Sequence, residues 1–476
     1  MKKFFIGLFV GVLLTVVVIV GIKHIKLYSS QEYDYGDLPV VRINTQDGKL
    51  PQDKENYINC SFEIANCKES SYNFKVEMKD AFDSKEGDGG VGVRLRGNTT
   101  MAYEKKPYRI KFKEDKSLFG LTEAKSWVLL ADYLDQSNIR NFAAMTLGNR
   151  VFDNLDFTAT PHHVILEING EYKGVYLLCE QMDEKEGRAN VEIDEDELYQ
   201  NHAKTEFPFM IEMDNYTSTD PTVADADKLM LDGYFPIEIK YPESKDRGIY
   251  EGKDVIYEYI EEYLLAVKTT LQTKQKINVS FREEPVGYED LIDVDSLIDY
   301  VLLNEIMYNP DSIWKSSYMY KSANVVDDET GEILEYGKLK FGPVWDFDAA
   351  MSWNFTNEPY DKSYIEGARA TTVFCGNIFF IEFIKDEANY QLCQQRWAET
   401  RSGVKDVVNY LRDYKAVIKA PSRSDALKYY GDTGIFQFDM QFDYVRLFLL
   451  DRIDYFDELF ALEHKEFLLT AGLPIE

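Results

Sequence analysis

Residues 341–352 read FGPVWDFDAAMS, and this stretch guides the interpretation of the whole chain. Asp346 and Asp348 stand two residues apart in an otherwise apolar and aromatic run. In a strand, residues i and i+2 point to the same face, so both carboxylates would share one side. Burying two like charges together is costly unless a cation lies between them. The stretch therefore predicts a strand that carries a divalent-metal site.

The preceding segments bring a third acid toward the same place. SSYMYKS (316–322) and KLKFGPVWDF (338–347) read as a strand pair joined by the acidic turn VVDDETGEI (325–333). Upstream, DVDSLIDYVLLNEIMY (293–308) reads as an amphipathic helix that stops at Asn309-Pro310, and Asp311 follows. An acid at that point suits turn chemistry or a helix cap as well as catalysis. The predicted strand that follows Asp311 would pair with the one that carries Asp346. We therefore expect the three aspartates to surround a metal–phosphate centre.

Such a centre is typical of phosphoryl transfer. Carboxylates suit Mg²⁺ or Mn²⁺, and the reaction also needs cations on the phosphates and an acid to orient the attacking hydroxyl. We assign the metal to Asp346 and Asp348 and the hydroxyl to Asp311. The cationic stretch RLRGNTTMAYEKKPYRIKFK (94–113) supplies the phosphate-binding candidates, which are Arg96, Lys105, Lys106, Arg109 and Lys111. Arg109 and Lys111 share one face of a predicted strand, a pattern that is equally typical of a solvated surface.

Composition excludes some classes of function. The 476 residues carry a net charge of −30, so the surface repels nucleic-acid phosphates and we expect no nucleic-acid partner. Only 5 histidines are present, which argues against a histidine-based zinc or catalytic design. Cys60 and Cys67 are close enough in sequence for a local disulfide. The glycines of GDGGVG (87–92) precede a strand-like run rather than a helix, so we expect a loop there.

The N-terminus predicts a membrane anchor. Residues 1–26 contain an uncharged run from Phe4 to Ile22, which as a helix is long enough to cross a bilayer core of about 30 Å. We expect a transmembrane helix with the main domain extracytoplasmic or surface-exposed. Cleavage after the run is the alternative.

The remainder divides into a β-rich and a helix-rich part. We predict a linker over 27–54, a β-rich lobe over 55–185 and a mainly helical lobe over 186–465. Within the first, Asn169-Gly170 is typical of a hairpin turn, and DQSNIRNFAAMTLGNRVF (135–152) has helical spacing. Surface strand pairing explains the charges in FMIEMDNY (209–216) and FPIEIKYPE (235–243) as well as a function does.

Several segments occur in the order seen in one protein family. They are RGNTT (96–100) with KKPYRIKF (105–112), SWVLLADYLDQSNIRN (126–141), EINGEYKGVYLLCEQMD (167–183), the helix before Asn309, KLKFGPVWDFD (338–348) and Arg396-Trp397. Together they resemble the CotH (spore coat protein H) family of atypical protein kinases over roughly residues 90–460.

The resemblance implies an α+β, atypical protein kinase-like bilobal fold that binds ATP and Mg²⁺ between its lobes. It implies transfer of phosphate to serine or threonine of protein substrates, such as coat or cell-surface proteins. Asp311 then matches the catalytic acid and Asp346 the metal-binding acid, with Asp348 assisting. Further matches are the adenine-side hinge at Glu180 and Met182, the pair Arg140 and Asn141, and Asn309.

The chain departs from ordinary protein kinases because it lacks H-R-D, D-F-G and V-A-I-K motifs. The lysine that holds the phosphates therefore stays open among Lys105, Lys106 and Lys111. A catalytically inactive binding or scaffold protein on the same fold is the alternative function. A nucleotide-sugar transferase using Asp346-Phe347-Asp348 as a D-x-D site is a third possibility, but no alternating strand–helix pattern accompanies it.

Overall fold

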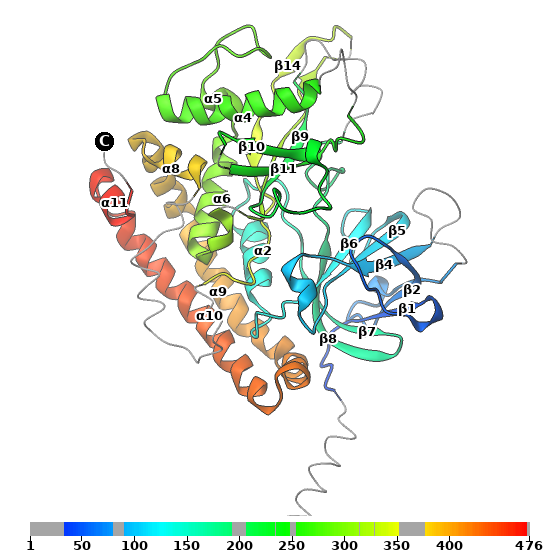
Figure 1. The fold of residues 1–476 in the computed structure, drawn as a ribbon. Coiled ribbons are helices and arrows are strands. Elements are labelled where there is room, and N and C mark those ends of the chain that lie inside the picture. The colour runs from blue at the N-terminus through cyan, green and yellow to red at the C-terminus, as the bar shows by residue number, and fades with distance from the viewer. Residues whose placement is uncertain are drawn as a thin grey trace, which may run out of the picture.

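The computed structural model describes residues 33–79, 90–192, 206–233, 235–247, 254–313, 315–327, 329–351 and 377–473. It has an α+β architecture (Figure 1). One large sheet is built from the N-terminal part of the chain. A second sheet and a group of helices come from the rest.

The large sheet closes on itself. Its strand order is β1-β7-β8-β6-β5-β4-β2-β3, and β1 also pairs with β2, so the first seven strands in this order form a ring. The strands are β1 (Val40–Thr45), β2 (Ile58–Ala65), β3 (Phe74–Val76), β4 (Val91–Leu95), β5 (Tyr108–Lys116), β6 (Ala124–Leu130), β7 (His162–Ile168) and β8 (Glu171–Glu180). Alternation works as predicted in β5, where Tyr108, Ile110 and Phe112 are buried in the core inside the ring. The turn at Asn169-Gly170 joins β7 to β8, and both turn residues have positive φ, as this hairpin type requires.

Two local predictions in this region need correction. The predicted disulfide is absent, because Cys60 and Cys67 are both free thiols. Cys60 lies buried in β2, where its side chain faces the core. In addition, β1 lies within residues 27–54, which we predicted as a linker, and it is the strand that closes the sheet.

The fold-class prediction is wrong because it included no closed sheet, and it also did not include a second sheet. Helices do make up most of the regular structure after residue 206, as predicted. Residues after 206 form a five-stranded sheet in the order β10-β11-β9-β12-β15. Its strands are β9 (Phe209–Met213), β10 (Lys228–Leu231), β11 (Phe235–Tyr241), β12 (Ser317–Lys321) and β15 (Leu339–Phe341). They are short and form two groups, β9–β11 and β12 with β15, which α4 (Val255–Thr273), α5 (Tyr288–Leu291) and α6 (Val294–Met307) separate in the sequence. The helical periodicity therefore dominated the sequence pattern. A separate hairpin, β13 (Val325–Val326) with β14 (Ile333–Glu335), connects β12 to β15.

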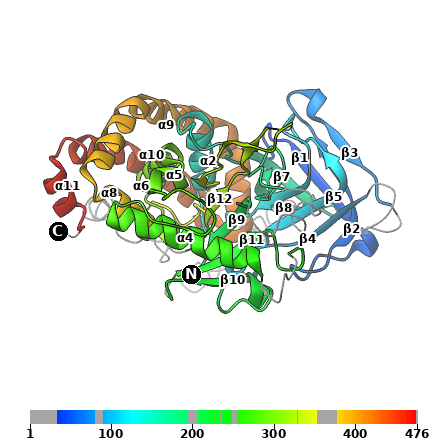
Figure 2. The ribbon, with the colours of Figure 1, turned by 90° about the horizontal axis from the view of Figure 1, so that it is seen from above.

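Helices pack on both sheets. The long helices α9 (Glu387–Tyr430) and α10 (Asp432–Leu459) run side by side (Figures 1 and 2), and α9 also contacts β8, α2 (Arg140–Arg150) and α6 (Val294–Met307). The other helices are α4 (Val255–Thr273), α5 (Tyr288–Leu291), α8 (Ile378–Ile384) and α11 (His464–Thr470). The predicted end of α6 is confirmed, since Tyr308 adopts a left-handed conformation just past Met307. Its start is capped by Asp293, which accepts a hydrogen bond from the Ser296 amide.

The predicted transmembrane helix and membrane-anchored location are not supported. Among the described residues, no helix combines the length and the apolar character that crossing a bilayer requires. Residues 1–26, on which the prediction rested, lie outside the described residues.

The expectation that Asp346 and Asp348 sit on a strand is also wrong. β15 pairs with β12 as predicted, with Met319 opposite Phe341, but it ends at Phe341. The chain then continues without regular structure, and Asp346 has a φ of 63°. Strand geometry therefore does not set the direction of the two carboxylates. Hydrogen bonds from neighbouring elements do so instead.

Candidate active site

The three predicted aspartates line one cleft. Asp311, Asp346 and Asp348 border a cavity of about 440 Å³ that lies between the β4–β5 connection and the five-stranded sheet. Arg96, Lys240 and Lys315 border the same cavity. Acids from two segments that are distant in sequence thus face a shared space together with these cations and Lys54.

Asp311 lies in a short 3-10 helix, η5 (Pro310–Ile313), directly after α6. Its carboxylate forms an ion pair of 2.8 Å with Lys315, and its amide donates to Oδ1 of Asn309 at 3.2 Å. Asn309 is buried, and its Nδ2 donates to Asn304 in α6. Burial and nearby Asp346 raise the pKa of Asp311, although the hydrogen bond from Lys315 opposes the shift. Asn309 therefore positions the acid, and Lys315 favours its charged form.

Asp346 is held in a left-handed backbone conformation beside the start of β12. Ser316 Oγ donates to its Oδ2 at 3.1 Å. The guanidinium of Arg96 lies over the ring of the preceding residue, Trp345, at 5.2 Å from the ring centroid. These contacts bring the β4–β5 connection, the start of β12 and the acidic segment together at one point.

Asp348 lies among other acids. Burial raises its pKa well above the usual range, and the charges of Asp346, Asp132, Asp135 and Asp311 raise it further. A divalent cation would relieve this repulsion. The described residues contain no group of three or more His, Cys, Asp or Glu side chains arranged to hold a metal ion alone. Mg²⁺ usually binds through one or two carboxylates together with waters and phosphate oxygens, so this pair of aspartates fits a site completed by a nucleotide.

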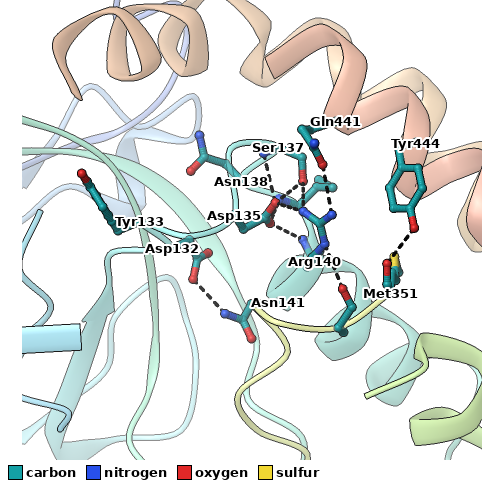
Figure 3. A network of polar contacts seen from close by, with 12 residues as sticks. Asp132, Tyr133, Asp135, Ser137, Asn138, Arg140, Asn141, Met351, Gln441 and Tyr444 are labelled. Atoms are coloured by element: carbon teal, nitrogen blue, oxygen red, sulfur yellow. Dashed lines mark hydrogen bonds and ion pairs between the residues drawn. The ribbon is translucent and has the colours of Figure 1, made fainter. Parts of the chain in front are cut away.

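The first turn of α2 holds the acidic segment in place (Figure 3). Asn141 Nδ2 donates to Asp132 at 2.8 Å. Its Oδ1 accepts from the Phe347 amide at 2.7 Å. Arg140 Nε donates to the carbonyl of Ala350 at 3.1 Å, and its Nη1 pairs with Asp135.

From the other side, Tyr444 of α10 donates to the carbonyl of Met351 at 2.8 Å (Figure 3). Arg140 and Asn141, which the family resemblance predicted as a pair, therefore make hydrogen bonds to backbone groups of the segment that carries Asp346 and Asp348.

The predicted phosphate-binding cations do not gather in the cleft, with the exception of Arg96. Lys105 is buried, pairs with Asp425 of α9 at 3.0 Å, and lines a small cavity of about 40 Å³ beside Asp346 and Asp348. Lys106 donates to the carbonyl of Met101 and borders a different cavity. Arg109 donates to Ser126, and half-buried Lys111 follows it on the same face of β5.

The two predicted hinge residues point in different directions. The carboxylate of buried Glu180 accepts from the Thr160 amide at 2.7 Å and lies 3.9 Å from Arg188, so it faces away from the cleft. Met182 borders a cavity of about 340 Å³, together with Arg109, Lys240 and Tyr318. Because Lys240 and Tyr318 also line the cleft, the two cavities are neighbours.

Sequence reasoning missed several residues of the cleft. Lys315 and Ser316 lie only four and five residues after Asp311 in the sequence. Their closeness to a predicted catalytic acid could have identified them. Lys240 was left as a surface residue, yet its ammonium lies 3.3 Å from Glu212 and 2.8 Å from Glu238 in the cleft wall. Burial raises the pKa of Glu212 to about 7, with Asp214 and Glu238 adding to the effect of burial and Lys240 opposing it. No local pattern predicted this cluster, because it forms across β9 and β11.

The family model described as CotH kinase protein matches residues 93–456. The chain belongs to the CotH kinase family. The match runs from β4 into α10 and contains all three aspartates of the cleft. The resemblance noted from the sequence motifs is thus confirmed, and membership supports a kinase-like protein. No curated protein matches this CotH kinase chain.

Proposed function

We propose that this protein transfers the γ-phosphate of ATP to serine or threonine hydroxyls of protein substrates with the help of Mg²⁺. The main support is the cleft in which Asp311, Asp346 and Asp348 face Arg96, Lys240 and Lys315, in a chain of the CotH kinase family. Phosphoryl transfer depends almost entirely on such positioning and charge neutralisation.

Asp346 and Asp348 are the proposed metal ligands. A bound Mg²⁺ would neutralise charge on the phosphates as the phosphoryl group moves. The mutual repulsion that raises the pKa of Asp348 supports this assignment. Asn141 and Ser316 would keep both carboxylates oriented through the contacts described above.

Asp311 is the proposed acid that accepts a hydrogen bond from the substrate hydroxyl. Its position between Lys315 and the metal-binding pair supports that role. Lys315, 2.8 Å away, favours the ionised form of Asp311 and is available to the transferred phosphate. Lys240 and Arg96 are the other cations available to the phosphates. We propose that the adenine occupies the neighbouring cavity bordered by Met182.

The experiment is transfer of labelled phosphate from γ-³²P-ATP to a mixed panel of proteins and to the enzyme itself. We expect Mg²⁺-dependent labelling of serine or threonine that falls at least about 10²-fold in Asp311→Asn and in Asp346→Asn. The control is Asp225→Asn, because Asp225 is exposed, pairs with Lys228 and does not border the cleft. Labelling that survives in both aspartate variants would refute the assigned roles. Mg-ATP binding without any labelling would instead favour the inactive scaffold.

A further inference from the structure

The β13–β14 hairpin is a two-stranded sheet of its own between β12 and β15. It lies at the top of the view in Figure 1. Neither strand pairs with another strand among the described residues, so each has one free edge. The proposed kinase chemistry does not use this element, which is the acidic turn noted in the sequence.

Apolar side chains are unusually exposed on this hairpin. Val325 and Val326 of β13 are 53% and 49% exposed, Leu334 of β14 is 63% exposed, and Tyr336 just after it is 42% exposed. Free strand edges with exposed apolar side chains are normally avoided, because they invite pairing with another chain. Their concentration within twelve residues therefore indicates a binding element.

The hairpin is firmly held at its base. Lys321, at the end of β12, is buried and lies 3.3 Å from the carboxylate of Glu206, which also pairs with Arg282. Lys321 donates to Asn324 Oδ1 at 3.4 Å. The guanidinium of Arg282 in turn lies 4.1 Å from the ring centroid of Tyr336. A buried ionic cluster thus fixes the start and the end of the hairpin, while its strands stay exposed. An element ordered in this way loses less entropy on binding.

The charge on the hairpin selects the partner. Glu329, Glu332 and Glu335 are exposed, and none has an ion-pair partner in the part of the chain that the structure describes. Asp327 instead caps the turn by accepting from the amides of Glu329 and Thr330. The unpaired carboxylates beside exposed valine and leucine complement a segment that carries both basic and apolar residues.

We propose that the β13–β14 hairpin docks the protein substrate, through an extended segment rich in lysine and apolar residues that adds as a strand to a free edge. This inference rests on the proposed kinase function. β12 starts next to Ser316, which bonds Asp346, and leads to the hairpin, whose first strand begins at Val325, nine residues after Ser316. At about 3.3 Å per residue, the docking segment would sit at most about 30 Å from the acceptor site. The phosphorylated hydroxyl and the docking segment are therefore separate parts of one substrate.

The test combines binding and kinetics in the full chain. The docking variant is V325T/L334T, because threonine suits strands but removes apolar surface. The charge variant is E332K/E335K. The matched control is M230T, since Met230 is exposed on β10, an edge strand of the other sheet. The binding probe is a fluorescein-labelled (Leu-Lys)₅ peptide with (Leu-Glu)₅ as its counterpart, and the kinetic substrate is histone H1.

We expect the wild type and M230T to bind the lysine peptide and not the glutamate peptide. Both hairpin variants should bind it at least about tenfold more weakly and show a matching rise in KM for histone H1, with kcat and self-labelling unchanged. Equal binding by all four proteins would overturn the docking inference, as would a wild-type dimer in sedimentation velocity that the hairpin variants abolish without affecting peptide binding. Hairpin-dependent binding by a wild type that labels nothing would retain the docking surface and refute the kinase function.

Discussion

Asn141 provides the sharpest link between the fold and the proposed metal site, and Asn141→Ala tests it. The side chain is buried and makes two hydrogen bonds, one to the Asp132 carboxylate and one from the Phe347 amide. Alanine removes both and leaves a buried amide and a buried carboxylate without these partners. The amide belongs to the residue between Asp346 and Asp348, so the change acts directly on the acidic segment.

The expected loss follows from those two bonds. A typical intramolecular hydrogen bond contributes about 1 kcal/mol net, and leaving a buried partner unsatisfied costs about 1–3 kcal/mol. The bond to a carboxylate stands at the upper end of this range. We therefore expect Asn141→Ala to lower the free energy of unfolding by about 3 kcal/mol. By analogy with residues that orient metal ligands, the apparent Mg²⁺ affinity should fall about 10- to 100-fold.

Asn149→Ala is the matched control. Asn149 lies in the same helix and also makes two hydrogen bonds, both donated to carbonyls, of Met145 and Ala159. It is exposed and lies two turns further along the helix than Asn141. The assays are urea unfolding and the Mg²⁺ dependence of ATP-induced thermal stabilisation. If the two variants lose equal stability and Mg²⁺ affinity is unchanged in Asn141→Ala, the positioning role is refuted.

Three other predictions concern the same region. Burial and neighbouring Asp135 raise the pKa of Asp132 from 3.8 to about 7. Between these pH values the folded state binds a proton that the unfolded state has lost, so the free energy of unfolding of the wild type falls as pH rises through this range. Asp132→Asn lacks this loss, and its advantage in urea unfolding should grow by about 3 kcal/mol between pH 5 and pH 8; a constant difference would contradict the shift. Lys105→Met should lower the free energy of unfolding by about 3–5 kcal/mol, because it leaves Asp425 buried and unpaired. Adding Asp425→Asn should recover most of that loss and leave the KM for ATP unchanged. A raised KM in the double variant would show that Lys105 binds phosphate. Asp348→Asn should stabilise the protein without metal and abolish the thermal shift caused by Mg-ATP, whereas an intact shift would remove Asp348 from the metal site.

Short-range patterns in the sequence were sufficient for much of the fold. The alternation in β5 and the turn at Asn169-Gly170 reflect local backbone chemistry, and so does the end of α6. Each was predicted correctly because neighbouring residues alone determine it.

Long-range contacts account for what the sequence did not reveal. The five-stranded sheet joins β9 to β12 across about a hundred residues, so no local pattern announced it. Lys105 looked like a phosphate ligand because its partner, Asp425, is 320 positions away. Lys240 joins the cleft only because β9 and β11 lie side by side.

For the segment that carries Asp346 and Asp348, the sequence predicted the residues correctly but not their geometry. Asp346 and Asp348 were chosen for the cost of burying two like charges, and that reasoning led to residues that line one cleft. The strand geometry assumed for them was wrong, because Asp346 is left-handed and is oriented by Ser316 and by its neighbours in α2. Chemistry identified the residues, while their geometry depended on elements elsewhere in the chain.

The most direct measurement is a crystal structure of the chain with Mn²⁺ and a non-hydrolysable ATP analogue. The account predicts an anomalous manganese peak at about 2.1 Å from carboxylate oxygens of Asp346 and Asp348, with the γ-phosphate turned toward Asp311. Manganese and nucleotide bound away from this cleft, with both carboxylates left in their present contacts, would contradict it.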